Sequence, residues 1–348
     1  MIRTIILSFI LFGLAYLLYV LPVFILKSLF TGSPVFSLLA LGPSALAFVC
    51  LRLYLATNTT NPGLKAFVYY GMGIGFLALM VLPAVMLAKQ GAGLDGAVAG
   101  WLAIAILGGV TALSVFNANS LTIRRLALNS DKLGKPVKLA FVSDVHIGSN
   151  PPAHLNRICD RLAQTEWDAV LIGGDLFDSS DFRFEDIAAL GELKGDIYFV
   201  TGNHEGYVRG FEAQLARFPE LNIRVLDNEA VDFQGLNLIG VSDEQPAASR
   251  AAAIDRLYRD DRFNLAMVHQ PSIWDSTRNR VELMLCGHTH NGQILPFNFL
   301  VRLQFRHVYG LFADGDSRLY VSSGSGCWGP RMRLGSRNEI VLIDLRPA

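Results

Sequence analysis

Five short polar clusters stand out because each one directly follows a run of apolar, β-type residues. They contain Asp144 and His146; Asp175 and Asp178; Asn203, His204 and Glu205; His269; and His288 and His290. Five of the seven histidines of the chain lie in these clusters. A single Asp or His after a strand is usually a turn residue or a helix N-cap. Five such clusters favour a common site, because ligand sites in α/β folds form beyond the carboxyl ends of strands.

The residue types in the clusters indicate metal chemistry. Carboxylate oxygens, an amide oxygen and imidazole nitrogens suit divalent ions such as manganese, iron, zinc or magnesium. The four cysteines stand outside the clusters, and no CxxC pair is present. Seven candidate ligands are more than one ion usually needs, so two ions that share a bridging carboxylate would use them all.

The segments that must position these clusters alternate between strand and helix patterns. The predicted strands are residues 137–143, 169–173, 197–201, 236–241, 263–268, 281–286, 319–322 and 340–345, which are short and rich in Val, Ile, Leu and Phe. Helical spacing occupies residues 154–164, 184–193, 211–218 and 250–258. This alternation predicts an α/β layered domain.

In order along the chain, the motifs D-x-H, G-D-x-x-D, G-N-H-E, H and G-H-x-H resemble those of the calcineurin-like metallophosphoesterase superfamily. Residues 287–293 and 324–335 are similar to its membrane-associated bacterial branch, which includes the YkuE and YaeI type proteins. Asn291 departs from that branch, which commonly has Gly there. The resemblance implies a four-layer domain over residues 137–348, in which a β-sandwich is flanked by helices.

The resemblance also implies a role for each cluster residue. One ion would be held by Asp144, His146, Asp175 and His290, and the other by Asp175, Asn203, His269 and His288. The expected ions are two manganese ions, with iron, zinc and magnesium as alternatives. His204 would face the scissile phosphate, and hydroxide formed at the two ions would attack it.

Other polar residues near these clusters have expected roles that do not include metal binding. Asp178 is expected to orient a histidine, whereas Glu205 is either buried behind the ligands or a solvated carboxylate. The glycine-rich segment 324–329 matches a dinucleotide fingerprint only formally, since Pro330 follows where a helix should open. Arg331 and Arg333 are either phosphate-binding residues or exposed arginines of a turn.

Residues 294–312 mix bulky apolar side chains with Arg302, Arg306 and His307. Such a segment is either a lid that lies on a bilayer surface, with its arginines toward lipid headgroups, or a buried hairpin. Because it begins four residues after His290, we favour the lid.

The first third of the chain is almost uncharged. Residues 1–118 hold five basic residues and one acidic residue, and the remainder holds 25 basic and 29 acidic residues. Four stretches, residues 5–26, 35–56, 66–88 and 94–116, are long and apolar enough to span a bilayer. The alternative for the first stretch is a cleaved signal peptide, but its apolar run is longer than that of a typical signal peptide. We therefore predict a transmembrane region at 1–118, a linker at 119–136 and the α/β domain after it.

Basic residues near the span ends predict the orientation. Arg3, Arg52, Lys65, Arg124 and Arg125 would share one side, with Lys27 and Lys89 opposite. The expected location is a bacterial inner membrane with the catalytic domain in the cytoplasm. The slightly acidic domain argues against a nucleic-acid partner.

Together these features predict a membrane-anchored, two-metal hydrolase of phosphate esters or pyrophosphates, whose partners are membrane lipids and a lipid-linked substrate. The alternatives are a pyrophosphohydrolase of the UDP-diacylglucosamine type from lipid A synthesis, a nuclease or soluble phosphodiesterase, and a non-catalytic membrane scaffold. The oligomeric state is not predicted.

Overall fold

The computed structural model describes residues 2–57 and 61–348. Part of the loop predicted between the second and third spans, residues 58–60, lies outside this range. The chain divides into two compact units, residues 1–116 with 329–332, and residues 117–328 with 333–348. The predicted end of the membrane region is residue 118, and this boundary stays a prediction.

The first unit contains the four predicted spans as helices. By length and composition, the segments that could cross a membrane are Ile5–Thr31, Leu38–Ala56, Pro62–Ala92 and Gly96–Asn119. The first is built from α1 (Ile2–Ala15), a π-helical turn η1 (Tyr16–Val20) and α2 (Leu21–Thr31). The others contain the 3₁₀ turn η2 (Leu38–Ala40), α3 (Leu41–Thr57), α4 (Pro62–Ala92) and α5 (Gly96–Asn119). The π turn ends beside Pro22, whose missing N–H cannot continue the regular hydrogen-bond ladder.

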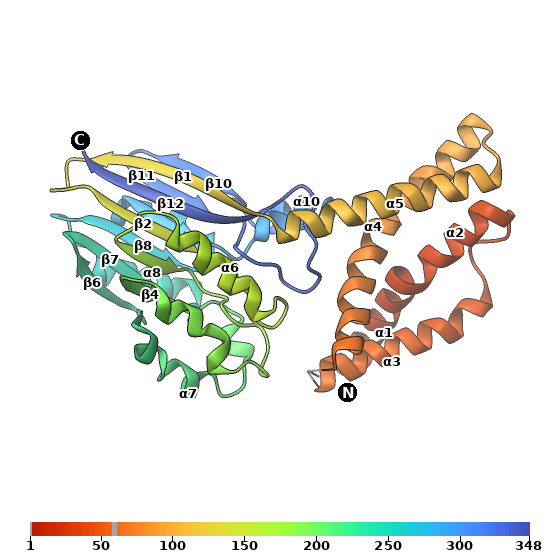
Figure 1. Ribbon diagram of the computed structural model, residues 1–348, viewed down its shortest axis with the longest axis horizontal. Coiled ribbons are helices and arrows are strands. Elements are labelled where there is room, and N and C mark those ends of the chain that lie inside the picture. The colour runs from red at the N-terminus through yellow and green to blue at the C-terminus, as the bar shows by residue number, and fades with distance from the viewer. Residues whose placement is uncertain (1, 58–60) are drawn as a thin grey trace. The chain divides into compact units, whose positions relative to one another are not determined.

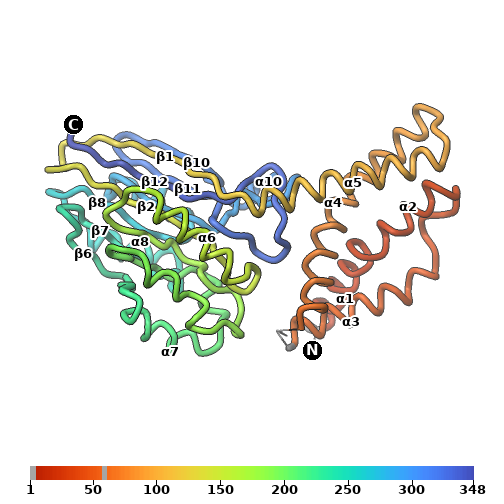
Figure 2. The backbone as a smooth tube through the Cα atoms, viewed as in Figure 1, coloured from red at the N-terminus to blue at the C-terminus, as the bar shows by residue number. Residues whose placement is uncertain are grey.

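The second unit contains two six-stranded sheets (Figures 1 and 2). The first has the order β1-β12-β2-β3-β4-β5, with strands β1 (Leu121–Ser130), β12 (Asn338–Pro347), β2 (Val137–Val142), β3 (Ala169–Ile172), β4 (Asp196–Phe199) and β5 (Ile223–Val225). The second has the order β10-β11-β9-β8-β7-β6, with β10 (Gly310–Asp314), β11 (Ser317–Val321), β9 (Leu283–Cys286), β8 (Phe263–Val268), β7 (Leu236–Val241) and β6 (Glu229–Phe233). The strands β2, β3 and β4 are parallel, as are β7, β8 and β9, so their carboxyl ends meet at one edge of each sheet.

Helices cover the outer face of each sheet and complete four layers. The inner core combines buried side chains from both sheets, such as Phe141 and Leu285. A second core lies between the first sheet and α6 (Pro152–Ala163) with the 3₁₀ segment η3 (Phe184–Glu192). A third core joins the other sheet to α8 (Ala247–Leu257) and α9 (Trp274–Thr277). The predicted fold class, a β-sandwich flanked by helices, is confirmed.

Short elements connect these layers. They are the 3₁₀ turns η4 (Glu205–Tyr207), η5 (Phe218–Leu221), η6 (Pro271–Ile273), η7 (Arg278–Arg280) and η8 (His290–Gly292), and the helices α7 (Phe211–Leu215) and α10 (Phe297–Gln304).

One sequence expectation was wrong in detail, and one of the two alternatives for residues 294–312 is excluded. Residues 121–130, expected within a linker, form β1, which pairs in parallel with β12 along its whole length. Its burial pattern lacks clean alternation, so the period-two signal of a half-buried strand is weak. The segment 294–312 is also not a buried hairpin, because α10 has no buried residue.

Candidate metal centre

The predicted ligands follow the carboxyl ends of strands from both sheets. Asp144 comes two residues after β2, Asp175 three residues after β3, and Asn203 four residues after β4. From the second sheet, His269 directly follows β8 and His288 follows β9. The edges of the two sheets therefore bring together side chains that are far apart in the sequence.

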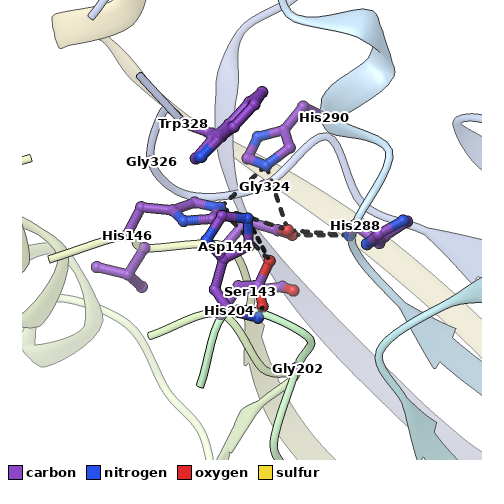
Figure 3. A network of polar contacts seen from close by, with 12 residues as sticks. Ser143, Asp144, His146, Gly202, His204, His288, His290, Gly324, Gly326 and Trp328 are labelled. Atoms are coloured by element: carbon purple, nitrogen blue, oxygen red, sulfur yellow. Dashed lines mark hydrogen bonds and ion pairs between the residues drawn. The ribbon is translucent and has the colours of Figure 1, made fainter. Parts of the chain in front are cut away.

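One group of potential ligands contains Asp144, His146 and His290. The Nε2 atoms of the two histidines lie 3.0 Å apart. Asp144 Oδ1 lies 3.9 Å from His146 Nε2 and 3.4 Å from His290 Nε2. Figure 3 shows these three side chains pointing toward one another. Both Asp144 and His146 are fully buried, so the group could hold a cation away from bulk water.

A second group contains Asp175, His269 and His288. Asp175 Oδ2 lies 3.1 Å from His269 Nε2, and His288 Nδ1 lies 3.3 Å from that same nitrogen. Asn203 Oδ1 is a fourth potential ligand atom and lies 2.8 Å from His288 Nδ1. These are the four residues of the second predicted ligand set, whose metal binding stays a prediction.

Asp175 lies between the two groups. Its Oδ2 atom is 3.7 Å from His146 Nε2 on one side and 3.1 Å from His269 Nε2 on the other. A carboxylate in this place is geometrically able to bridge two ions. A third potential group, His146, Asp175 and His204, overlaps both of the others.

Burial and charge shift the ionisation of these groups strongly. Burial raises the pKa of Asp144. For Asp175 burial acts in the same direction, but the adjacent histidines outweigh it and hold its pKa below the usual value. Burial lowers the pKa of His269, yet the carboxylates, Asp175 first, overcome it and raise that pKa to about 10. Burial, and then His269, lower the pKa of His288 to about 3. Such opposed shifts in one cluster are typical of functional sites.

The backbone of the cluster is strained. Asp144, His146, Asp175, His288 and His290 all have left-handed φ values, between 50° and 72°. Each such non-glycine residue costs on the order of 1 kcal/mol or more, and these conformations gather at functional sites. Gly202 and Gly287 permit the close approach, because a Cβ atom on either would collide with the carboxylate of Asp175 or Asp144, respectively.

Comparison with known proteins agrees with this geometry. The family model described as calcineurin-like phosphoesterase matches residues 137–292. The Escherichia coli protein named Phosphodiesterase YaeI is 31% identical over 246 residues, which is 64% of this chain and 86% of that protein. This chain belongs to the calcineurin-like phosphoesterase family.

Other relatives in the calcineurin-like phosphoesterase family are longer than the matched region. An uncharacterized metallophosphoesterase of Helicobacter pylori is 35% identical, and the match covers 65% of this chain but only 64% of that protein. The Bos taurus protein named Transmembrane protein with metallophosphoesterase domain is 31% identical over 61% of this chain and 53% of its own length.

In this calcineurin-like phosphoesterase, Asp178 and Glu205 lie behind the ligands. Asp178 accepts a hydrogen bond from Ser149 N, at 2.8 Å, and its Oδ2 lies 3.6 Å from His146 Nδ1. Glu205 is 1% exposed and accepts hydrogen bonds from the backbone N–H groups of Asp175, Phe177 and Gly202. Glu205 is therefore a buried carboxylate and not a solvated one.

His204 lies at the edge of the cluster. Its ring contacts that of His146 edge-on, with centroids 4.7 Å apart, and its Nε2 is 4.0 Å from Asp175 Oδ2. Burial lowers the pKa of His204 to about 4. Its side chain is still 16% exposed, so a ligand can reach it from solvent.

The structure does not support Arg333 as a phosphate-binding residue. Its side chain is fully buried, and its guanidinium donates hydrogen bonds to the carbonyl oxygens of Ser323, Gly326 and His290. These bonds tie the glycine-rich segment to the strained loop at His290. Arg331 belongs to the segment 329–332 of the other compact unit, and its role stays a prediction.

Sequence reasoning missed three residues near the centre. The rings of Tyr207 and Trp328 both contact the His204 ring, and Gln293 exchanges two hydrogen bonds with the Trp328 backbone. Gln293 and Trp328 stand in the two segments that carry the family resemblance. Their spacing in the chain gave no sign that they meet.

Proposed function

We propose that this chain is a membrane-anchored, two-metal phosphoesterase that hydrolyses a phosphate ester or a pyrophosphate. One observation carries the proposal. Two groups of buried ligands meet at a single carboxylate, Asp175, with His204 at their edge. The first ion would be held by Asp144, His146, Asp175 and His290, and the second by Asp175, Asn203, His269 and His288.

The residues present fit two divalent cations. Ring nitrogens and carboxylate oxygens that face one another at 3.0 to 3.9 Å repel through their lone pairs unless a proton or a cation lies between them. His269 Nδ1 donates to the carbonyl oxygen of Gly173 at 2.8 Å, so its Nε2, which faces Asp175 at 3.1 Å, is the nitrogen that would bind an ion in exchange for its proton. Oxygen and imidazole donors without thiolates suit manganese, with iron, zinc or magnesium as alternatives.

When bound, two such ions lower the pKa of water and offset the charge of the phosphoryl oxygens. In the hydrolysis, the attacking water would give up a proton to solvent and its oxygen would bond to phosphorus, while the bond to the departing oxygen breaks and that oxygen takes up a proton. His204 is placed to hold the phosphate through its ring N–H. A bound phosphate anion beside His204 would raise the pKa of its ring above the value that burial gives it. The protonated ring could then supply the proton that the departing oxygen takes up.

The residues behind the ligands keep this geometry. Asp178 orients His146, Glu205 holds the backbone of the Asp175 loop, and Arg333 holds the carbonyl oxygen of His290. Each acts through a ligand and does not touch the substrate, so we assign them positioning roles.

A lipid-linked substrate is supported by two features of the chain. Four helices are apolar enough to span a membrane, which would hold the catalytic unit at a bilayer. Phe299, Leu300 and Leu303 lie on one face of α10 and are 59%, 56% and 84% exposed. The positive charges of Arg302 and Arg306 beside them would attract anionic lipid headgroups. We propose that this exposed face of α10 lies on the bilayer. The membrane would be a bacterial inner membrane, with the second unit on its cytoplasmic side.

Helix α10 is also connected to the proposed centre. The backbone of Asn298 lies so close to Gly292 that a Cβ there would collide with it, and the Phe305 ring contacts the His288 ring at 5.2 Å. A helix that lies on the bilayer would therefore hold the ligands near the headgroup layer, where a lipid phosphate is found.

The test uses the full chain in lipid nanodiscs, supplied with Mn²⁺ and a panel of lipid phosphates, nucleotide-linked lipids and soluble phosphodiesters. We expect metal-dependent release of phosphate or alcohol from a lipid substrate. His204→Ala should retain the wild-type metal content and lose about 10²- to 10⁴-fold in kcat.

Two results would count against the proposal. Absence of bound metal in the wild-type protein would remove the hydrolase assignment. Faster cleavage of soluble phosphodiesters or single-stranded nucleic acid than of every lipid would remove the lipid assignment and favour the phosphodiesterase or nuclease alternative.

A further inference from the structure

Two exposed aromatic side chains flank His204. The Tyr207 ring contacts the His204 ring edge-on with centroids 5.5 Å apart, and the Trp328 ring does so at 5.7 Å. Tyr207 is 72% exposed and Trp328 is 52% exposed. Among described residues of the second unit, the other large apolar side chains that are at least 46% exposed are Phe297, Phe299, Leu300, Leu303 and Leu311. Exposed aromatic side chains beside a polar cluster commonly mark a binding surface.

Hydrogen bonds hold the backbone that carries each ring. The side-chain amide of Gln293 donates to the Trp328 carbonyl and accepts from the Trp328 N–H, each at 3.0 Å. Gln293 is itself only 9% exposed. Tyr207 ends the short turn η4, whose first residue is the buried Glu205, and its N–H donates to the carbonyl of His204 at 2.9 Å. The two rings are thus presented to solvent on an ordered backbone, which limits the entropy lost on binding.

Position decides which part of a substrate these rings would meet. On its inner side His204 faces His146 and Asp175, which belong to the proposed ligand sets, whereas Tyr207 and Trp328 lie against it with exposed faces. An in-line attack from the side of the proposed ligand sets would put the departing oxygen on the opposite side, toward His204, so the group attached to that oxygen would extend toward these two rings. Figure 3 shows His204 and Trp328 among the residues around the centre.

We propose that Tyr207 and Trp328 form a leaving-group subsite that selects phosphate esters whose departing alcohol carries a ring. The faces of aromatic side chains bind flat or CH-rich rings, such as an aryl group, a sugar or a nucleobase, better than a straight chain of the same size. This inference rests on the proposed function and adds a substrate class to it.

The experiment compares benzyl and n-hexyl phosphates, each as mono- and diester, in the full chain with Mn²⁺. Both leaving groups are primary alcohols of similar size, so they differ mainly in the ring. The wild-type protein should favour benzyl esters. Trp328→Ala and Tyr207→Ala should each lower the benzyl-to-hexyl ratio of kcat/KM by about 2- to 10-fold, mostly through KM. Trp328→Phe and Tyr207→Phe should retain most of the preference.

Two controls separate the subsite from the reaction. Trp101→Ala removes a tryptophan that is 64% exposed on α5 and should leave the ratio unchanged. Benzylphosphonate and n-hexylphosphonate, whose P–C bonds resist hydrolysis, report binding directly by calorimetry. The alanine variants should lose affinity for the benzyl compound selectively.

Equal ratios in the wild-type protein and both alanine variants would overturn the subsite, as would phenylalanine variants that lose as much as the alanine variants. If the wild-type protein binds the phosphonates selectively but hydrolyses no ester with Mn²⁺, the proposed function fails while the subsite stands. If it hydrolyses both esters without preference, only the subsite fails.

Discussion

Replacing Glu205 by alanine should destabilise the second unit strongly. The carboxylate accepts backbone hydrogen bonds from Asp175 at 2.9 Å, Phe177 at 3.1 Å and Gly202 at 2.7 Å, all in a buried setting. Alanine leaves three buried N–H groups without an acceptor, at about 1 kcal/mol or more each. The total is therefore about 3 kcal/mol or more, which corresponds to a fall in Tm of about 6 to 12 °C for a unit of this size.

Glu205→Gln separates the hydrogen bonds from the charge. Burial, and then the Asp175 carboxylate, raise the pKa of Glu205 to about 7, so the ionised form is costly in the metal-free protein. Glutamine removes that charge and keeps one oxygen for the N–H groups of Asp175 and Gly202, but turns its amide toward the N–H of Phe177. We expect it to lower Tm less than alanine does.

The assay is thermal unfolding of the full chain in detergent with excess EDTA, followed by tryptophan fluorescence. EDTA keeps metal binding from adding to the measured stability. The matched control is Glu220→Ala, since Glu220 is 57% exposed and pairs with Arg217 at the surface; its expected effect is within about 0.5 kcal/mol. Equal Tm values for the wild-type protein and Glu205→Ala would refute the reasoning that these three bonds hold the Asp175 loop.

Two further changes follow from the same structure. Arg333→Met leaves the carbonyl oxygens of Ser323, Gly326 and His290 without their buried donor, so Tm should fall by 5 °C or more. Arg337→Met, at an exposed arginine nearby, should not shift Tm, and equal shifts would contradict a specific role for Arg333. Leu303→Ser removes the most exposed apolar side chain of α10 and should raise KM for a vesicle-bound lipid phosphate about 5-fold relative to a soluble ester. An unchanged ratio would show that α10 does not lie on the bilayer.

The gathering of the candidate ligands at one place was predictable because their types and positions in the sequence indicate it. A carboxylate, amide or imidazole directly after an apolar run signals a strand end, and parallel strands bring their ends to one edge. The apolar spans were predictable for a similar reason, since about 20 uncharged residues have few other structures open to them. The helical layers followed from the alternation of strands and helices.

What the sequence could not predict depends on contacts between distant residues. The sequence allows Arg333 to be a phosphate-binding arginine, but in the structure its side chain is buried and donates a hydrogen bond to the carbonyl oxygen of His290. Strand β1 lacks a clean alternating pattern, so its sequence predicts a linker, whereas its pairing with β12 makes it a strand. The left-handed backbone of Asp144 and Asp175 and the meeting of Gln293 with Trp328 have no local sequence signal either.

The metal content of the purified full chain tests the shared carboxylate most directly. After loading with Mn²⁺ and removal of free ions, elemental analysis of the wild-type protein should find two ions per chain. Asp175→Asn should hold one ion or none, because the bridge contributes to both proposed sites, whereas Asp255→Asn, at an exposed carboxylate, should still hold two. A wild-type protein with a single ion, or an Asp175→Asn variant that retains two, would contradict a two-metal centre built on Asp175.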